Sequence, residues 1–175
     1  MKQKARILIF TGDGKGKTTA ALGLALRAAG HQLRVLVLQF VKAGQKTGEL
    51  AAARRIPGFE IEQRGCGFVP PEQSPEFDVH RRAAEAVLRE AAETLRAGSH
   101  DVVVLDELCL AVAKNLVSEQ SALEVVGLAG VGTVLVLTGR GATPGLIAAA
   151  DTVTEMCVLK HGMQAGIRAQ RGVEF

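Results

Sequence analysis

The chain has 175 residues, 47% of them hydrophobic, which suits one folded domain with one core and excludes a disordered or fibrous protein. Its 21 Lys and Arg and 18 Asp and Glu alternate along the sequence, so no basic block indicates a nucleic-acid partner. The three cysteines are far apart and form no CxxC pair, and the apolar run 7–10 is too short for a signal sequence or a membrane span. We therefore expect a single domain over residues 1–175, in the reducing cytoplasm, without a nucleic-acid or membrane partner.

The first elements are a strand, a glycine-rich turn and a helix. Residues 5–11 form a near-continuous apolar run, which predicts a buried strand. After the turn, an Ala/Leu-rich stretch predicts a helix over 19–29 that ends at Gly30. A second buried strand is predicted over 33–40, and strands apolar on both faces are typical of parallel sheets covered by helices on each side.

The middle of the chain contains the longest predicted loop and the longest predicted helix. A short helix over 49–55 is followed by an alternating strand over 59–63, a pattern expected near a sheet edge. Residues 64–75 are rich in Gly and Pro and predict a long loop, which we interpret as a candidate lid. Apolar residues at three-to-four spacing predict a helix over 78–97 that ends at Gly98.

Strands and helices continue to alternate toward the C-terminus. Apolar runs predict strands over 102–105, 133–138 and 153–159, and residues 108–116 predict a helix. Two further helix starts are predicted, by the capping box of Ser121 and Glu124 and by Thr143 followed by Pro144. This order predicts an α/β fold with a doubly wound, mostly parallel sheet, whose ligands bind beyond the carboxyl ends of the strands.

The sequence TGDGKGKTT at residues 11–19 lies between the first strand and the first helix and matches the P-loop pattern, with Thr11 in place of the usual first glycine. Glycines let backbone N–H groups turn toward phosphate oxygens, while Lys17 reaches a phosphate and the Thr18 hydroxyl can bind Mg²⁺. A turn that only caps a helix is the alternative, and Lys15 is either a solvated lysine or a second phosphate contact. The predicted nucleotide-binding residues are Gly12, Asp13, Gly14, Lys15, Gly16, Lys17, Thr18 and Thr19.

Charged residues also follow two later strands. Asp106 and Glu107 end the apolar strand over 102–105, where P-loop proteins place the acid that holds Mg²⁺; the alternative is that they cap the next helix. Arg140 follows the strand over 133–138 and would point into the same crevice to bind phosphate, unless it is an exposed loop arginine. The three cysteines are interpreted as small buried side chains and not as nucleophiles.

A series of motifs carries a resemblance that covers nearly the whole chain. The motifs are GDGKGKTTAALG at 12–23, QFVK at 39–42, GF at 67–68, VVVLDEL at 102–108, TGRG at 138–141, ADTVTEM at 150–156 and KHGMQAGIRAQRGVEF at 160–175. In this order they resemble the P-loop corrinoid adenosyltransferases of the bacterial cobalamin pathway. The resemblance implies a RecA-like sheet, a homodimer, and a reductase or flavoprotein that donates the electron.

The resemblance also implies the reaction and the residue roles. The 5′-deoxyadenosyl group of MgATP would be transferred to the cobalt(I) of a corrinoid, with release of triphosphate. Thr18 and Glu107, with Asp106 as the other candidate, would hold the metal, while Lys17 and Arg140 would neutralise the leaving triphosphate. Gly67 and Phe68 would belong to the corrinoid-facing loop, in which Pro70 stands where family members commonly have tryptophan.

Three questions stay open at this point. Phe68 is either a side chain that packs the loop against the core or one that is offered to a flat ligand. The enzyme could instead be a small P-loop kinase, which would need an arginine-bearing lid. From a different class, a RecA-type ATPase switch would need partner surfaces or a basic stripe.

Overall fold

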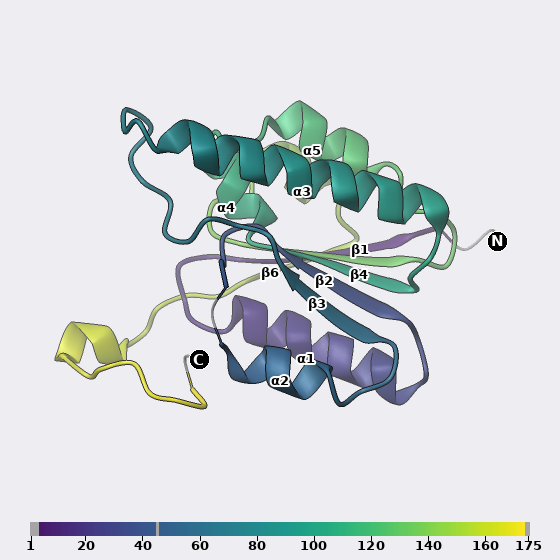
Figure 1. Cartoon of the computed structure of the whole chain (residues 1–175), viewed down its shortest axis with the longest axis horizontal. Coiled ribbons are helices and arrows are strands. Elements are labelled where there is room, and N and C mark those ends of the chain that lie inside the picture. The colour runs from purple at the N-terminus through teal and green to yellow at the C-terminus, as the bar shows by residue number, and fades with distance from the viewer. Residues whose placement is uncertain (1–3, 45, 174–175) are drawn as a thin grey trace.

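The computed structural model describes residues 4–44 and 46–173, and its centre is a six-stranded sheet in which all the paired strands are parallel (Figure 1). The strand order is β3-β2-β4-β5-β1-β6, so the strand that precedes the P-loop lies between β5 and β6. The predicted parallel sheet is confirmed, and β3 lies at an edge as predicted. The strands are β1 Arg6–Thr11, β2 Val35–Gln39, β3 Phe59–Gln63, β4 Val102–Asp106, β5 Val134–Thr138 and β6 Thr152–Glu155.

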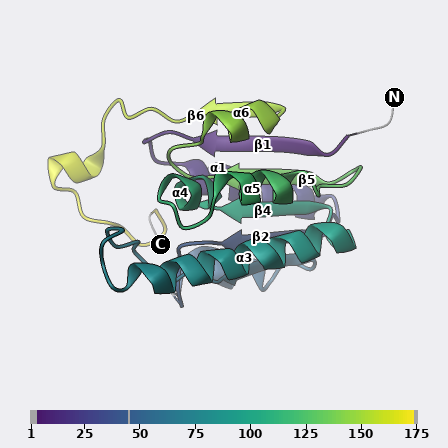
Figure 2. The same cartoon turned by 90° about the horizontal axis from the view of Figure 1, so that it is seen from above.

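Helices cover both faces of this sheet, as expected for a doubly wound fold. Helices α1 and α2 lie on one face, and α3, α4 and α5 lie on the other (Figure 1). Seen from above, α6 lies on the second face beside β6 and β1 (Figure 2). The helices are α1 Lys17–Gly30, α2 Gly48–Ala53, α3 Phe77–Ala97, α4 Leu108–Ala113, α5 Glu119–Val126 and α6 Pro144–Ala149.

The two faces of the sheet have cores of different side-chain size. Alternate residues of a strand point to opposite faces, so Val103 and Leu105 of β4 join the core under α3, α4 and α5. The neighbouring Val102 and Val104 join the core under α1. On that side the buried helix residues are alanines, whose small side chains let α1 lie close to the sheet.

Three predicted boundaries are wrong for identifiable local reasons. Ser121 does not cap α5, because Ser118 is the N-cap and accepts a hydrogen bond from the Ser121 backbone. Helix α4 ends at Ala113 and not at residue 116, since Asn115 has a positive φ of 57°. The last strand stops at Glu155 and not at residue 159, because the next residue turns to hydrogen-bond the P-loop.

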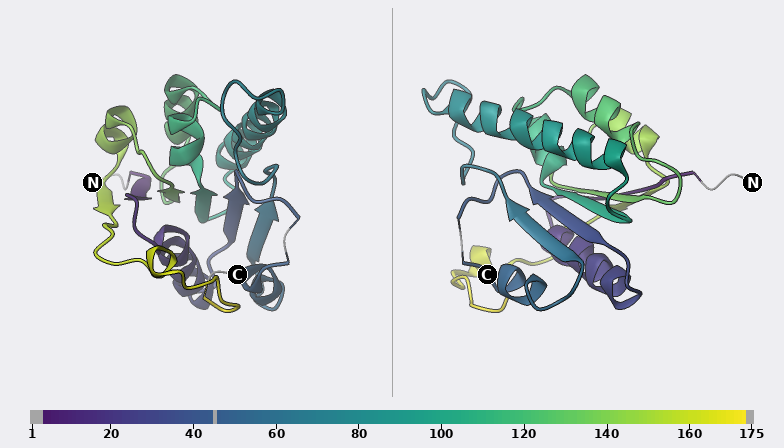
Figure 3. Two further views of the ribbon diagram at one scale, coloured as in Figure 1. Left: turned by 90° about the vertical axis from the view of Figure 1, so that its left-hand side faces the viewer. Right: turned by 45° about the vertical axis from the view of Figure 1, so that its right-hand side comes forward.

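The chain beyond β6 leaves the sheet and runs toward α2. It contains one 3₁₀ turn, Gly162–Ala165, and passes across the molecule to the region where α1 and α2 begin (Figure 3). Residues 156–173 contribute no side chain to either core. Among the described residues, no helix is both long enough and apolar enough to span a bilayer.

Candidate functional site

The P-loop connects β1 to α1, and its backbone requires glycine at two positions. Gly12 and Gly16 have φ values of 91° and 119°, which side-chain-bearing residues rarely adopt. Lys17 is the first residue of α1, so the helix dipole and the first free N–H groups face the loop. Its buried ammonium donates hydrogen bonds of 2.7 Å to the Gly12 carbonyl and 2.8 Å to the Gly14 carbonyl.

The segment after β6 supports the loop from outside. The Gly14 N–H donates a 2.6 Å hydrogen bond to the Met156 carbonyl, and the Met156 N–H donates to the Thr11 carbonyl at 2.9 Å. A Cβ atom on Gly12 or Gly14 would lie only 2.5 Å or 2.7 Å from the same Met156 oxygen. The glycines are therefore needed for this close approach as well as for the turn.

Asp106 is the centre of a buried hydrogen-bond network at the ends of β2, β4 and β5. Its Oδ1 accepts from the Thr18 hydroxyl at 2.8 Å and from the Thr138 hydroxyl at 2.7 Å. Its Oδ2 accepts from the Gln39 amide at 3.0 Å. With both oxygens bonded to protein donors and 1% of the residue exposed, Asp106 is suited to holding the Thr18 hydroxyl in place.

Glu107 is held differently, with its side chain in the cavity beside the P-loop. Its backbone has a φ of 67°, in a region that non-glycine residues seldom occupy, and its N–H donates to the Thr138 hydroxyl at 2.9 Å. Its Oε2 atom is buried without a hydrogen-bond partner in residues 4–44 and 46–173. Strain and an unpaired carboxylate oxygen at the same residue mark a functional position.

Opposite charges share this site. Burial raises the pKa of Glu107, the nearby Asp106 charge raises it further, and Lys17 opposes both effects. Burial also lowers the pKa of Lys17, while Glu107 works in the opposite direction. A cation bound beside Glu107, or an anion bound beside Lys17, would offset the cost of burying each charge.

The P-loop cavity has a volume of about 460 Å³ and brings together most of the predicted nucleotide-binding residues. Glu107 lines the same space, which places the predicted metal-binding acid opposite the loop. The lining residues are Lys15, Gly16, Lys17, Thr18, Thr19, Leu22, Lys42, Gly48, Glu49, Glu107, Gly172 and Val173. A phosphate chain with a bound divalent cation matches this pattern of cations, N–H groups and two carboxylates, of which Glu49 is paired with Lys42.

Gly12, Asp13 and Arg140 were predicted site residues, and none of them lines the P-loop cavity. Asp13 and Gly12 line a separate cavity of about 410 Å³. Arg140 is exposed and contacts Asp13, with 3.7 Å between its Nε and the Asp13 Oδ1 and a 3.5 Å hydrogen bond to the Asp13 carbonyl. The arginine thus lies next to the P-loop but outside the P-loop cavity, and its side chain matches the alternative of an exposed loop arginine.

Four further residues of the site were not assigned roles from the sequence. Gln39 and Thr138 bind Asp106, and Lys42 forms a 2.6 Å ion pair with Glu49 at the cavity wall. Lys42 also holds the pKa of Glu49 below its ordinary value against the opposing effect of burial. Gln39 and Lys42 belong to the QFVK run and Thr138 to the TGRG run, so the motif series had marked three of the four.

Phe68 does not pack the loop against the core, because 94% of its surface is exposed. That packing is made by its neighbour Val69, which lies against the larger core. Upstream, the Gly67 N–H donates to the Val41 carbonyl at 2.7 Å, and Gly65 lies so close to Val41 that a Cβ atom would meet its carbonyl at 2.3 Å. The loop is fixed on both sides of Phe68, whose ring points into solvent.

The interpretation of the cysteines as buried side chains is confirmed for one residue and wrong for two. Cys109 is fully buried, and burial raises its pKa to about 12, which excludes it as a nucleophile at neutral pH. Cys66 and Cys157 are exposed. Within the described residues, no group of three or more His, Cys, Asp or Glu side chains is arranged to hold a metal ion by itself.

Comparisons with known proteins agree with this architecture. The chain is 41% identical over 174 residues to the corrinoid adenosyltransferase of Pseudomonas aeruginosa, an alignment that covers 99% of this chain and 85% of that protein. It is 35% identical over 173 residues to the corrinoid adenosyltransferase of Escherichia coli K12, covering 99% and 87%. The fold is similar to that of the KaiC-like protein PH0186 of Pyrococcus horikoshii, with a TM-score of 0.59 at 17% identity, covering 90% of this chain and 74% of that one.

The family model described as ATP:corrinoid adenosyltransferase BtuR/CobO/CobP matches residues 3–175. That match spans every element of the fold and every residue of the P-loop cavity. The chain belongs to the ATP:corrinoid adenosyltransferase family.

Proposed function

We propose that this protein transfers the 5′-deoxyadenosyl group of ATP to the cobalt(I) of a corrinoid and releases triphosphate. The observation that carries the proposal is the P-loop cavity, in which Lys17, Thr18 and the unpaired Glu107 oxygen converge. Membership of the corrinoid adenosyltransferase family identifies the second substrate. Neither a kinase nor an ATPase switch is favoured by these observations.

The reaction needs no nucleophile from the protein, because cobalt(I) is the nucleophile. The protein has to position the two substrates and neutralise the charge of the leaving triphosphate. Cobalt(I) supplies the electron pair that forms the cobalt–carbon bond to C5′, and the bond from C5′ to the α-phosphate oxygen breaks. The triphosphate keeps the electron pair of the broken C5′–O bond and leaves with the negative charge. Lys17 and the N–H groups at the start of α1 stabilise this charge, which is the electrostatic contribution expected of such a site.

The residues present fit Mg²⁺, which prefers oxygen ligands in an octahedral arrangement. The Thr18 hydroxyl and the unpaired Oε2 of Glu107 would hold the ion, while Asp106 would orient Thr18 through the 2.8 Å hydrogen bond. When bound, Mg²⁺ would neutralise part of the triphosphate charge. In this proposal Glu107 is a direct ligand and Asp106 supports the second ligand, Thr18, whereas the sequence left Asp106 as the other candidate for the ligand position.

The corrinoid would approach from the side of the exposed loop. The Phe68 ring is free of core contacts and is held by Gly67 and Val69 on either side, so it can be offered to a flat ligand without loop rearrangement. Arg140 would add a positive charge next to the P-loop for the leaving triphosphate.

Three further expectations belong to the same proposal. A second copy of the chain and a reductase or flavoprotein electron donor are the expected partners, supported by family membership. A cytoplasmic location is supported by the three cysteines, which are free within the described residues. Sedimentation of the purified protein tests the homodimer directly.

The decisive experiment mixes the protein anaerobically with MgATP and chemically reduced cob(I)alamin. The visible spectrum should change to that of an alkylated cobalt, and triphosphate should appear in equal amount. The Lys17→Ala protein, with its melting temperature checked against that of the wild type, is the matched control, because it lacks the phosphate contact. Conversion of ATP to ADP with an unchanged cobalt spectrum would replace this proposal with a kinase or switch.

A further inference from the structure

The C-terminal segment reaches the P-loop cavity, although it is far from the P-loop in sequence. Gly172 and Val173 line the cavity opposite the first turns of α1. The views agree that the segment passes from β6 to the region beside α2 (Figures 1 and 3). Gly172 and Arg171 also line an adjoining cavity of about 380 Å³ with Lys46, Thr47, Gly48 and Ala51, which places the segment along the start of α2.

Lys15 attaches this segment to the P-loop. Its Nζ donates a 3.0 Å hydrogen bond to the Val173 carbonyl, across 158 positions of sequence. The sequence left Lys15 as either a solvated lysine or a phosphate contact, and the structure gives it a contact that neither alternative includes. The P-loop and residues 172–173 therefore line one cavity, and the Lys15 side chain bonds one to the other.

The chemistry of the cavity is divided between its two sides. Cations and N–H groups of the P-loop suit phosphates. Leu22 of α1 and Val173 of the C-terminal segment are the large apolar side chains of the lining. A flat, largely apolar group between two aliphatic side chains is a common arrangement for a nucleotide base, because both ring faces are removed from water.

We propose that residues 167–173 form a strap that closes the P-loop cavity, contacts the nucleoside of the bound nucleotide through Val173, and is held there by Lys15. This inference rests on the proposed function, in which ATP is a substrate, and assigns the contact with its nucleoside to Val173. Arg171 is carried on the same strap, so closure also brings a positive charge to the mouth of the cavity beside Lys46.

The strap is separate from the parts that stabilise the fold. Its large apolar side chains are exposed, including Ile167 at 68% and Val173 at 53%, and none belongs to either core. Its upstream turn is closed by its own backbone, with the Ile167 N–H donating to the Gly162 carbonyl at 2.9 Å. Removing the strap should therefore leave the sheet and its helices folded.

The test compares the full-length protein with a chain that ends at Gly166, using direct binding of ATP and of inorganic tripolyphosphate. The shortened chain should keep its melting temperature and bind ATP about tenfold more weakly, the effect expected when one valine-sized contact is lost. Tripolyphosphate has no nucleoside, so its affinity should fall much less. If the shortened chain binds ATP as tightly as the full-length protein, or loses equal affinity for ATP and for tripolyphosphate, the strap proposal is wrong.

Point variants keep the test informative if the shortened chain is unstable. Val173→Asp should weaken ATP binding, whereas Ile167→Asp, on the same segment but outside the cavity lining, should not. Lys15→Met should weaken ATP binding less in the shortened chain than in the full-length protein, because the shortened chain has no Val173 carbonyl for Lys15 to bind. Equal effects of Lys15→Met in the two chains would count against the role of Lys15 in holding the strap. Nucleotide binding is measured without corrinoid, so failure of adenosyl transfer alone would refute the proposed function and leave the strap standing.

Discussion

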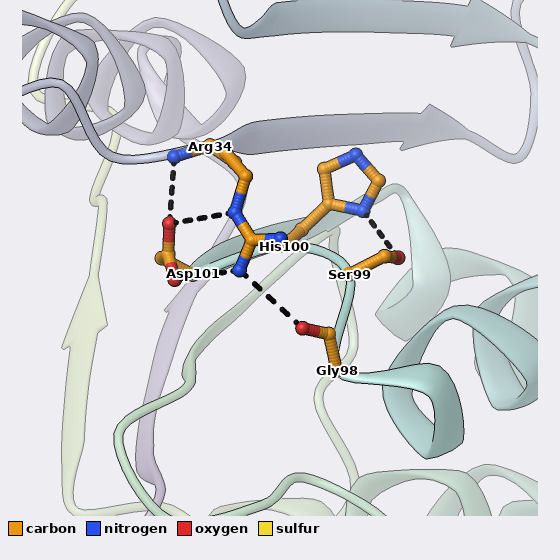
Figure 4. Close-up of polar contacts among 5 residues, drawn as sticks. All are labelled: Arg34, Gly98, Ser99, His100 and Asp101. Atoms are coloured by element: carbon orange, nitrogen blue, oxygen red, sulfur yellow. Dashed lines mark hydrogen bonds and ion pairs between the residues drawn. The ribbon is translucent and has the colours of Figure 1, made fainter.

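Strands β2 and β4 are linked at each end by the side chain of an aspartate, and the two links differ in charge and burial. At the amino ends, Arg34 and Asp101 form a 3.0 Å ion pair, and Arg34 also donates to the Gly98 carbonyl (Figure 4). At the carboxyl ends, Gln39 donates to Asp106. The same two neighbouring strands therefore carry a charged, partly exposed link at one end and a buried link at the other.

The donors explain the difference. Asp101 is paired with a guanidinium near the surface, which holds the pKa of this carboxyl below its ordinary value and fastens the two strands with a contribution that water screens. Asp106 receives its hydrogen bonds from neutral groups, the hydroxyls of Thr18 and Thr138 and the Gln39 amide. None of these three donors carries a positive charge, and the charge of Asp106 acts on the neighbouring Lys17 and Glu107.

The largest expected effect is at the carboxyl end, where Lys17→Ala should nearly abolish adenosyl transfer. Loss of one charge-assisted contact to a developing charge costs about 2–4 kcal/mol of transition-state stabilisation. The rate under anaerobic conditions and the melting temperature are the two measurements, and only the rate should fall. Wild-type turnover in a folded Lys17→Ala protein would remove the phosphate-binding role.

Glu107→Gln should reduce activity by a smaller factor, which added Mg²⁺ should partly restore, because an amide is a poorer ligand for this ion than a carboxylate. Asp106→Asn is the matched comparison and should respond less to added Mg²⁺, since Asp106 acts on the ion only indirectly, by orienting the Thr18 hydroxyl. Rescue of Asp106→Asn and not of Glu107→Gln would exchange the two roles.

Glu107→Gln should also not destabilise the protein at neutral pH. Burial raises the pKa of Glu107, so the folded state favours the protonated carboxyl, and this contribution to stability is lost as the pH rises through the folded pKa. The variant should therefore melt at the same or a higher temperature near neutral pH, with a difference that narrows as the pH falls. Thermal denaturation across this range gives the answer, and a variant that is less stable at neutral pH would indicate a missing stabilising contact.

Phe68→Ala should leave stability unchanged, whereas Val69→Ala should lower it, because only Val69 packs against the core. The activity loss in Phe68→Ala should be larger when cobalt must be reduced from cob(II)alamin on the enzyme than when cob(I)alamin is supplied. We expect this difference if the corrinoid-facing loop displaces an axial ligand of cobalt, which would make the cobalt(II) easier to reduce. Equal losses in both assays would limit Phe68 to corrinoid binding.

The smallest effect is expected at the amino end, where Arg34→Ala should lower the melting temperature slightly and leave activity unchanged. The pKa of Asp101 is lowered by Arg34, so the stabilisation is present above the ordinary value of 3.8 and is lost as the pH falls through the folded pKa. Melting curves of wild type and variant should converge in that acidic range. A loss of turnover in Arg34→Ala would show that the two ends of the strands are coupled.

The sequence by itself determined the features that depend on neighbours along the chain. Apolar runs located the strands to within a few residues, except for the early end of β6, and Gly98 ended α3 as predicted. The P-loop was recognisable because its glycines, Lys17 and Thr18 must follow one another between a strand and a helix. The charges Asp106 and Glu107 were located because a buried strand ends there.

Only the tertiary structure decided which of these residues act together. Asp106 and Glu107 are adjacent in sequence, yet the distant donors Gln39 and Thr138 bond both oxygens of Asp106. The Oε2 of Glu107 has no hydrogen-bond partner in the part of the chain that the structure describes. Phe68 is exposed because its neighbour Val69 takes the packing position. Lys15 meets Val173 because the chain returns across the sheet. These contacts join residues whose separation is fixed by the strand order, and local periodicity carries no information about that order.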